Sequence, residues 1–457
     1  MLESGDLKRT LLTLAIPGVV SMLVNAVYNV VDTLFIGMLH DTAALGATAI
    51  IFPIFLLTGA IGLAFGMGAA SVVSRRLGEK KREEASRVAT TAIFTTFCVG
   101  VVMAIIGFSF ATPLLRLLGA TDTILSAAKS YGRIIIAGSF FQMTAMCANN
   151  VIRAEGAAKR ASLAMIIGAV TNMVLDPIFI FGLGLGIRGA AIATIASQAL
   201  GALIGLEFLI RRRGVLSLSL KLFSPSLRRY LDIMTIGTPT FIQQLLVSVA
   251  ISLQNGIAGQ YGDAAVASMG VMGRLLSLAM MAIFGLGQGM QPLAGYAYGA
   301  GRNDRVKGAL NLTILWGCCL GLTAALGFGF LAAPIVRLFS RDPQVIEIGA
   351  KALRLASLGL PLVAFFNAFR ILFQALGRGR PAIILALARQ GFILIPCMLL
   401  LSRLFGLTGL LVSIPVADTI TAALTAFLGG SVITSLKKQP YPRGTLTPAE
   451  LDAHEQR

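Results

Sequence analysis

Charged residues and histidine are scarce in this 457-residue sequence. Asp, Glu, Lys and Arg together make up 13% of it, and the only two histidines are His40 and His454. A soluble globular domain carries about 25% charged residues, so the composition excludes that class. Neither histidine lies inside an apolar run, which excludes a His-based catalytic or metal-binding constellation within those runs.

Cysteine is also scarce, and its placement argues against disulfide or metal chemistry. All five cysteines fall within long apolar runs, where cysteine behaves as a small apolar packing residue. We therefore expect no disulfide framework, no cofactor and no resident metal. The cysteines are Cys98, Cys147, Cys318, Cys319 and Cys397.

Apolar residues are abundant and form runs long enough to cross a bilayer. Hydrophobic residues make up 56% of the sequence, and the mean hydropathy is +0.83. A backbone exposed to lipid is satisfied only in a helix or a closed barrel, and the alternation typical of barrel strands is absent. These runs therefore predict transmembrane helices of about 20 residues. Twelve are expected, at 11–37, 48–73, 88–112, 129–152, 161–183, 190–210, 232–259, 268–296, 309–333, 352–375, 381–402 and 406–434.

The positive charge is distributed unevenly between the loops. The net charge of +18 comes from 38 Lys and Arg against 20 Asp and Glu. Basic residues gather in alternate loops, for example Arg75 and Arg76, and such loops lie on the cytoplasmic side under the positive-inside rule. This asymmetry predicts that both termini are cytoplasmic, and we expect a multi-pass protein of the plasma (inner) membrane. It accounts for the charge without a nucleic-acid partner, and we expect none.

Glycines recur at an interval of about 221 residues. Each half of the chain contains an even number of predicted spans, so the halves share one orientation and are related by an axis along the membrane normal. We predict an all-α polytopic membrane protein with twelve transmembrane helices in two pseudo-symmetric six-helix lobes, and a monomer. The expected parts are an N-terminal lobe at 1–215, a cytoplasmic linker at 216–229, a C-terminal lobe at 230–436 and a cytoplasmic tail at 437–457. The recurring glycines are Gly66, Gly68 and Gly78, which return as Gly287, Gly289 and Gly299.

Two aspartates, Asp32 and Asp176, lie inside predicted spans of the first half. A charged side chain at the centre of a span costs at least about 2.5–3.5 kcal/mol, so it usually faces protein or water and marks an ion or substrate path. Asn172 lies four residues before Asp176 and shares its helix face. Pro177 removes a backbone donor and frees carbonyls that can coordinate a cation or water. The pattern favours an ion site in the first half.

Three segments carry a resemblance to a known family. They are Val31-Asp32-Thr33, then NMVLDPIFIFG at 172–182 with GAAIAT at 189–194, and GLGQGMQPLAGYAYGA at 285–300. The sequence resembles the multidrug and toxic compound extrusion (MATE) transporters, and the resemblance extends over both halves. It implies a transporter rather than an enzyme. In that family, H⁺ or Na⁺ bound within a lobe drives export of amphipathic, often cationic drugs or toxic metabolites by alternating access.

The same resemblance assigns the site residues. It places Asp32, Asn172, Asp176 and Thr194 at the cation-coupling positions, with H⁺ or Na⁺ as the coupling ion. The seventh span has glutamines where some family members carry an acidic residue, so the pattern is closest to the DNA-damage-inducible branch. The further residues expected to contact substrate or gate its path are Tyr28, Asn29, Gln198, Gln288, Gln291 and Asp418.

These residues also have structural alternatives. Asp32 and Asp176 can form a hydrogen-bonded pair between helices, and Asn172 or Thr194 can join helices without binding an ion. Asp418 can equally be a packing residue whose carboxylate is satisfied by a neighbour. Three arginines lie near predicted span ends, where a long side chain is expected to snorkel to the interface rather than bind substrate. They are Arg274, Arg370 and Arg389.

Rival classes of protein fit parts of the sequence. A lipid-linked oligosaccharide flippase has the same architecture, but we expect it to line its cleft with cationic residues, whereas the mid-membrane charge here is acidic. A membrane-embedded enzyme needs an acidic metal-binding cluster or a catalytic histidine, and the sequence shows neither. A channel needs a repeated filter-like loop, which is absent. The prediction is a transporter whose partners are small amphipathic molecules and the lipid bilayer.

Overall fold

The computed structural model describes residues 6–39 and 41–438, and these residues are almost entirely helical. His40, His454 and residues 439–457 of the expected tail lie outside the described residues. Among the described residues, ten helices are long and apolar enough to cross a membrane, or eleven if the bent pair Pro343–Ser357 and Leu360–Ala375 counts as one span. The predicted all-α polytopic fold is confirmed.

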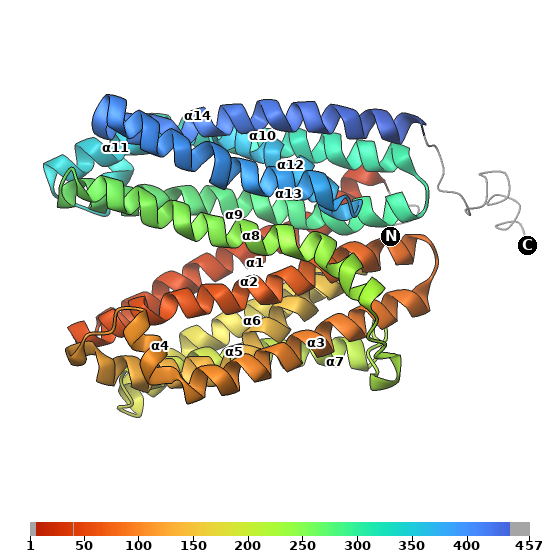
Figure 1. Ribbon diagram of the computed structural model, residues 1–457, viewed down its shortest axis with the longest axis horizontal. Helices are drawn as coiled ribbons and strands as arrows, with labels where there is room; N and C mark the ends of the chain where they lie inside the picture. Colours follow the sequence, from red (N-terminus) through yellow and green to blue (C-terminus); the bar gives the residue numbers. More distant parts are fainter. Residues whose placement is uncertain (1–5, 40, 439–457) are drawn as a thin grey trace, which may run out of the picture.

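The twelfth predicted span lies within the last apolar stretch, Gly379–Leu436. Gly406 has a φ of 61° there, a left-handed conformation that breaks the helix. The helical segments before and after the break run side by side (Figure 1). The stretch therefore corresponds to two predicted spans, 381–402 and 406–434.

The first half of the chain forms the N lobe. Its helix α5 packs against α2, α3 and α7, and α1 packs against α6. The elements of the N lobe are α1 (Leu7–Gly37), α2 (Thr42–Gly78), α3 (Arg82–Ser109), α4 (Ala111–Leu117), α5 (Asp122–Ala154), α6 (Ala158–Pro177), the π-helical turn η1 (Ile178–Gly182) and α7 (Ile187–Ile210).

The second half forms the C lobe, after a linker that contains the short turn η2 (Leu220–Leu222). Helix α8 begins at Leu227, so the last three residues of the linker expected at 216–229 are helical. The elements of the C lobe are α8 (Leu227–Gly259), α9 (Asp263–Gly299), α10 (Asn303–Arg337), α11 (Pro343–Ser357), α12 (Leu360–Ala375), α13 (Gly379–Leu387), the π-helical turn η3 (Ala388–Leu394) and α14 (Ile395–Lys438).

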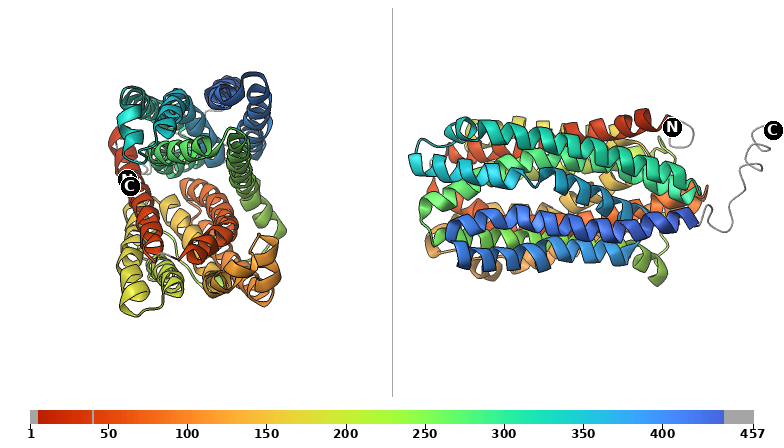
Figure 2. Two further views of the ribbon diagram at one scale, coloured as in Figure 1. Left: turned by 90° about the vertical axis from the view of Figure 1, so that its left-hand side faces the viewer. Right: turned by 90° about the horizontal axis from the view of Figure 1, so that it is seen from above.

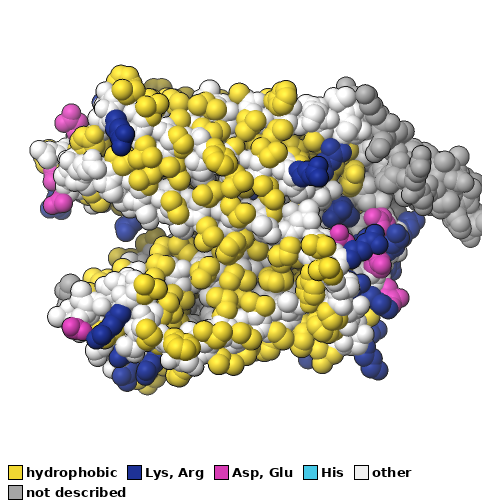
Figure 3. All heavy atoms as spheres, viewed as in Figure 1, with side chains coloured by type: hydrophobic (Ala, Val, Ile, Leu, Met, Phe, Trp, Pro, Cys, Tyr) yellow, Lys and Arg dark blue, Asp and Glu magenta, His cyan; other side chains and the backbone are white. Residues whose placement is uncertain are grey.

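The two lobes lie side by side (Figures 1 and 2) and diverge toward one end (Figure 1). The space-filling view shows a cleft between them at the end away from the start of α1, which we call the open end (Figure 3). We call the opposite end the closed end. On the face shown, hydrophobic side chains cover the middle of the bundle and most charged side chains gather at its two ends, as expected of a surface that faces lipid.

Glycines bring the two lobes together at the closed end. Helix α1 packs on α9, and α2 packs on both α8 and α9. A Cβ atom added at Gly78 would collide with the carbonyl oxygen of Tyr296, and one added at Gly299 would collide with the carbonyl oxygen of Arg75. Gly299 and Tyr296 each lie 221 positions after their counterparts. The sequence repeat thus appears in the structure as a pseudo-two-fold contact that only glycine permits.

Candidate functional site

The two predicted aspartates come together in the N lobe. Asp32 lies near the end of α1 and Asp176 near the end of α6, and their carboxyl groups are within hydrogen-bonding reach of each other. Asp176 is fully buried, whereas Asp32 is half-buried with its Oδ1 atom enclosed and unpartnered. Two carboxyl groups in contact cannot both be charged unless a proton or another cation joins them.

Asn172 and Thr194 extend this cluster onto α7. Both side chains are buried. With its amide nitrogen toward Asp176, Asn172 donates to Oδ2 at 3.0 Å, and its oxygen accepts the backbone N–H of Thr194 at 3.2 Å. The four residues assigned to cation coupling by resemblance therefore lie together, on α1, α6 and α7. Carboxylate, amide and hydroxyl oxygens are ligands suited to a hard cation such as Na⁺.

The helix beside Asp176 is irregular. α6 ends at Pro177 and continues into the π-helical turn η1, in which the N–H of Leu183 donates to the carbonyl of Ile178 at 2.8 Å. Such turns are frequent at functional sites. The disturbance that Pro177 predicts is therefore present, on the side that follows the proline.

Two tyrosines flank the carboxyl pair. Tyr28 and Tyr131 both interact electrostatically with Asp32 and Asp176. Tyr28 is one of the predicted candidates, but sequence reasoning missed Tyr131, which is 9% exposed. A signal was present, because Tyr131 is one of only seven tyrosines and lies in a predicted span. A buried tyrosine hydroxyl usually needs a polar partner.

A cavity of about 430 Å³ lies between the lobes. Methionine and phenylalanine side chains from both lobes contribute much of its apolar wall, and thioethers adapt to ligands of varied shape. Six of the residues predicted to couple the cation, contact substrate or gate its path line it, namely Tyr28, Asn29, Asn172, Gln198, Gln288 and Gln291.

Asp418, also predicted as a substrate or gating residue, is not among the residues that line the cavity. Its Oδ1 accepts from Arg389, at 2.9 Å from Nη2 and 3.1 Å from Nε. The side chains of Asp418 and Arg389 are 4% and 12% exposed. The structure thus places Asp418 in a buried ion pair within the C lobe and not in the cavity wall.

We expect Asp418→Asn to lower the thermal stability of the protein sharply. The change leaves the guanidinium of Arg389 buried without its counter-charge, and breaking a buried pair from one side costs about 3–5 kcal/mol. Thermal unfolding in detergent measures the loss. The double variant Asp418→Leu/Arg389→Met serves as the control and is expected to recover much of it. A single variant as stable as the unchanged protein would contradict this role.

Snorkelling is the wrong expectation for two of the three arginines near span ends. Arg389 is buried against Asp418, with its guanidinium 5.8 Å from the ring centroid of Phe366, and Arg370 lines the cavity. Arg274 is exposed. Hydropathy locates a span but not the direction in which a residue on it points, which is why the sequence misplaced these two side chains.

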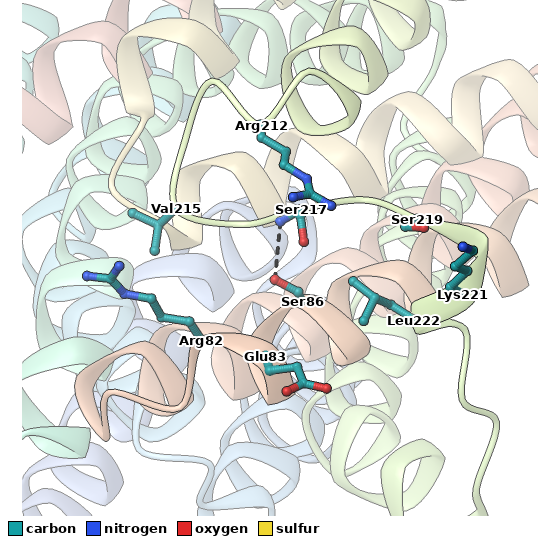
Figure 4. Close-up of a pocket in the computed structure, with 9 residues that line it drawn as sticks. All are labelled: Arg82, Glu83, Ser86, Arg212, Val215, Ser217, Ser219, Lys221 and Leu222. Carbon is teal, nitrogen blue, oxygen red and sulfur yellow. Dashed lines mark hydrogen bonds between the residues drawn. The ribbon is translucent and has the colours of Figure 1, made fainter.

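The linker is seated on the closed end of the N lobe. Glu155, between α5 and α6, is 8% exposed and accepts the backbone N–H groups of Val215 at 3.0 Å and Leu216 at 2.9 Å. A shallow hollow of about 370 Å³ lies beside this contact, where Ser86 of α3 accepts the backbone N–H of Ser217 at 3.2 Å (Figure 4). Burial raises the pKa of Glu155 to about 7 from an ordinary value of 4.5, against the opposing effect of the two backbone hydrogen bonds.

Docking of the linker is therefore expected to weaken as the pH rises. A raised pKa means that the docked form binds the proton more tightly than the released form, so docking is strongest below pH 4.5 and is lost as the pH passes through about 7. Hydrogen exchange at Val215 and Leu216, corrected for the intrinsic rate, should show protection falling between about pH 6 and about pH 8. Glu155→Gln should remove that dependence. An equal dependence in the variant would contradict the assignment.

Two lobes of membrane-spanning helices enclose a cavity that is closed at one end, with polar side chains buried beside it. These features define a polytopic membrane transporter. The MatE family model matches residues 17–178 and 239–400, which is more than half of the chain. The chain belongs to the MATE family of transporters.

Relatives and solved structures support the same assignment. The chain is 29% identical over 430 residues to the multidrug export protein MepA of Staphylococcus haemolyticus (strain JCSC1435), covering 93% of this chain and 94% of that protein. It is 28% identical over 426 residues to MepA of Staphylococcus aureus (strain MSSA476), with the same coverage. Its fold matches the outward-facing conformation of a multidrug resistance MATE family transporter with a TM-score of 0.91, 29% identity, and coverage of 96% of this chain and 98% of that chain.

Proposed function

We propose that this protein is a multidrug exporter, a cation-coupled antiporter that moves amphipathic, often cationic compounds out of the cell by alternating access. The observation that carries the proposal is the contact between the carboxyl groups of Asp32 and Asp176 beside the cavity. The names of the MepA relatives support the substrate class and give no support to the flippase alternative. The coupling ion is H⁺ or Na⁺.

The coupling ion and the cationic substrate compete for the negative charge of the carboxyl pair, and this competition couples ion movement to transport. Asn172 connects the carboxyl pair with the cavity, because it contacts Asp176 and also lies in the cavity wall. In the outward-open state, uptake of H⁺ or Na⁺ by Asp32 and Asp176 neutralises the pair and favours release of the substrate. Once the charge is compensated, the lobes rock to the inward-open state. Asn172, Asn29 and Thr194 hold the geometry of the pair with neutral polar atoms.

The orientation follows from charge. Clusters of basic residues such as Arg75 and Arg76 lie at the end of α2 that forms the closed end, where α1 also begins. Under the positive-inside rule that end is cytoplasmic, so both termini are cytoplasmic and the cleft opens to the outside. Both lobes belong to one chain, which acts as a monomer in the plasma (inner) membrane. Gln243 and Gln244 on α8, where some relatives carry an acidic residue, favour the DNA-damage-inducible branch.

A pH-jump assay in proteoliposomes tests this function. We expect an imposed proton or sodium gradient to drive uptake of a fluorescent organic cation into proteoliposomes that contain the protein in the inside-out orientation. Runs with and without sodium identify the coupling ion. Transport that needs neither gradient would contradict coupled antiport and would indicate passive flipping.

A further inference from the structure

The wall of the central cavity carries positive charge and no negative charge. Among the described residues that line it, the ionised side chains are Arg153 on α5 and Arg370 on α12, and no aspartate or glutamate is present. Asp32 and Asp176 do not line it, and Asn172, which does, contacts Asp176. A cavity suited only to cations would not be expected to contain two guanidinium groups.

Arg370 has neutral partners only. Its Nη2 donates to Asn367 Oδ1 at 2.6 Å, its Nη1 lies 3.4 Å from Gln243 Oε1 and 3.5 Å from Gln374 Oε1, and its buried Nε has no partner. The charged side chain that acts on it is another cation, Arg389. Since Arg389 is already paired with Asp418, the positive charge of Arg370 is uncompensated within the C lobe.

Arg153, in the N lobe, likewise has neutral partners only. It is 4% exposed, and its Nε donates to Asn149 Oδ1 at 2.8 Å, while its Nη2 has only weak contacts with Ser21 and Met165. Its Nη1 is buried without a partner. Neither Arg153 nor Arg370 lies in a salt bridge to any described residue.

The unpartnered polar atoms in the cavity wall are mostly donors. Arg153 Nη1, Arg370 Nε and Gln291 Nε2 are N–H donors without partners, against a single unpartnered acceptor, Gln288 Oε1. A buried guanidinium stays charged, and burying an ion without a counter-charge is costly. A ligand that brings an anionic, hydrogen-bond-accepting group satisfies both the charge and the donors. Arginine is well suited to carboxylate and phosphate because its planar fork bonds both oxygens.

We propose that Arg370 and Arg153 form an anion subsite in the central cavity, which binds the carboxylate, sulfonate or phosphate of an amphipathic molecule while its apolar body lies against methionine and phenylalanine side chains. This inference rests on the proposed export function and adds a substrate class to it. Zwitterionic amphiphiles become substrates as well as cations, with the anionic group held at the arginines.

A pair of dyes that differ in one charge tests the subsite. A rhodamine with a free carboxylate and its methyl ester share the ring system and the positive charge. In nanodiscs of zwitterionic lipid, fluorescence anisotropy should show the carboxylate dye binding about ten-fold more tightly than the ester, as expected for a charge-assisted hydrogen bond. Arg370→Gln should abolish this preference while ester binding stays within about two-fold, and Arg370→Lys should keep only part of the preference.

The matched control is Arg274→Gln, which removes the same charge from an exposed position of the C lobe outside the cavity and should preserve the preference. Equal binding of the two dyes to the unchanged protein would overturn the proposal, and this comparison requires no variant to fold. Equal weakening of both dyes by Arg370→Gln would overturn it too.

Lipid composition separates the two possible sources of the anion. If phosphatidylglycerol added to the nanodiscs displaces the carboxylate dye from the unchanged protein but not from Arg370→Gln, the subsite holds a lipid headgroup phosphate. If it has no effect, the subsite belongs to the soluble substrate. Either result supports an anion subsite. The binding assay involves no ion gradient, so a failure of coupling and a failure of the subsite are distinguishable.

Discussion

Asp32→Asn and Asp176→Asn should each reduce gradient-driven efflux by about ten-fold or more, within the range that coupling free energies span. An amide keeps the size of the side chain but cannot exchange a proton or neutralise a cation. The contact is then between one carboxyl group and an amide, which does not need a cation to join them, and the ion no longer biases the equilibrium between outward-open and inward-open states. Gradient-driven uptake of a fluorescent cation into everted vesicles measures the effect.

The matched control for these variants is Asp122→Asn. Asp122 belongs to the same lobe and loses the same charge, but its side chain is 92% exposed at the start of α5. This variant should transport at the unchanged rate. If either buried variant also did so, the carboxyl pair would be a structural contact between α1 and α6, which is the alternative that the sequence left open.

Gly78→Ala and Gly299→Ala should open the closed end. Each added Cβ meets a backbone carbonyl of the other lobe, which cannot rotate away as a side chain can. Overpacking costs about 1–3 kcal/mol, and each ~1.4 kcal/mol shifts the ratio of closed to opened protein about ten-fold. Ser74, which is fully buried and packs against Gly295 across the same seam, reports the opening. In a chain whose five cysteines are replaced, Ser74→Cys should react with maleimide several-fold faster in either glycine variant.

Gly273→Ala is the control for the seam. Gly273 lies on α9, as Gly299 does, but nothing lies within 4 Å of an added Cβ. With Gly273→Ala, Ser74→Cys should react with maleimide at the same rate as it does in the cysteine-replaced chain without a glycine substitution. Unchanged labelling in Gly78→Ala and Gly299→Ala would mean that the lobes adjust without separating, and the seam would then not control access to the cavity.

Hydropathy was sufficient to predict the fold, because a chain in lipid has few ways to satisfy its backbone. The repeated glycines indicated two related halves, and the contact of Gly78 and Gly299 with the opposite lobe gives the physical reason for their spacing. The break at Gly406 agrees with the gap between the last two predicted spans. Composition and the spacing of the repeated glycines were therefore sufficient to predict the architecture.

The site was only partly predictable. Asn172 and Asp176 share a helix face, and proximity along the chain indicated their contact. The partners of Arg389 and the placement of Arg370 depend on how helices rotate and pack, which apolar runs do not encode. The charge of the cavity wall was therefore misjudged from the sequence, where the aspartates stood out and the arginines looked interfacial. Tyr131 was missed because its partners come from α1 and α6.

Cation release on substrate binding tests most directly whether Asp32 and Asp176 hold the coupling ion. Purified protein in weakly buffered detergent solution near neutral pH is mixed with the methyl-ester dye, and a pH indicator or a sodium electrode records the ion released. We expect about one H⁺ or Na⁺ per dye bound to the unchanged protein, and none from the Asp32→Asn/Asp176→Asn double variant, since neutralising the pair removes the competition. The same release from the double variant would contradict the account. So would the release of neither H⁺ nor Na⁺ from the unchanged protein.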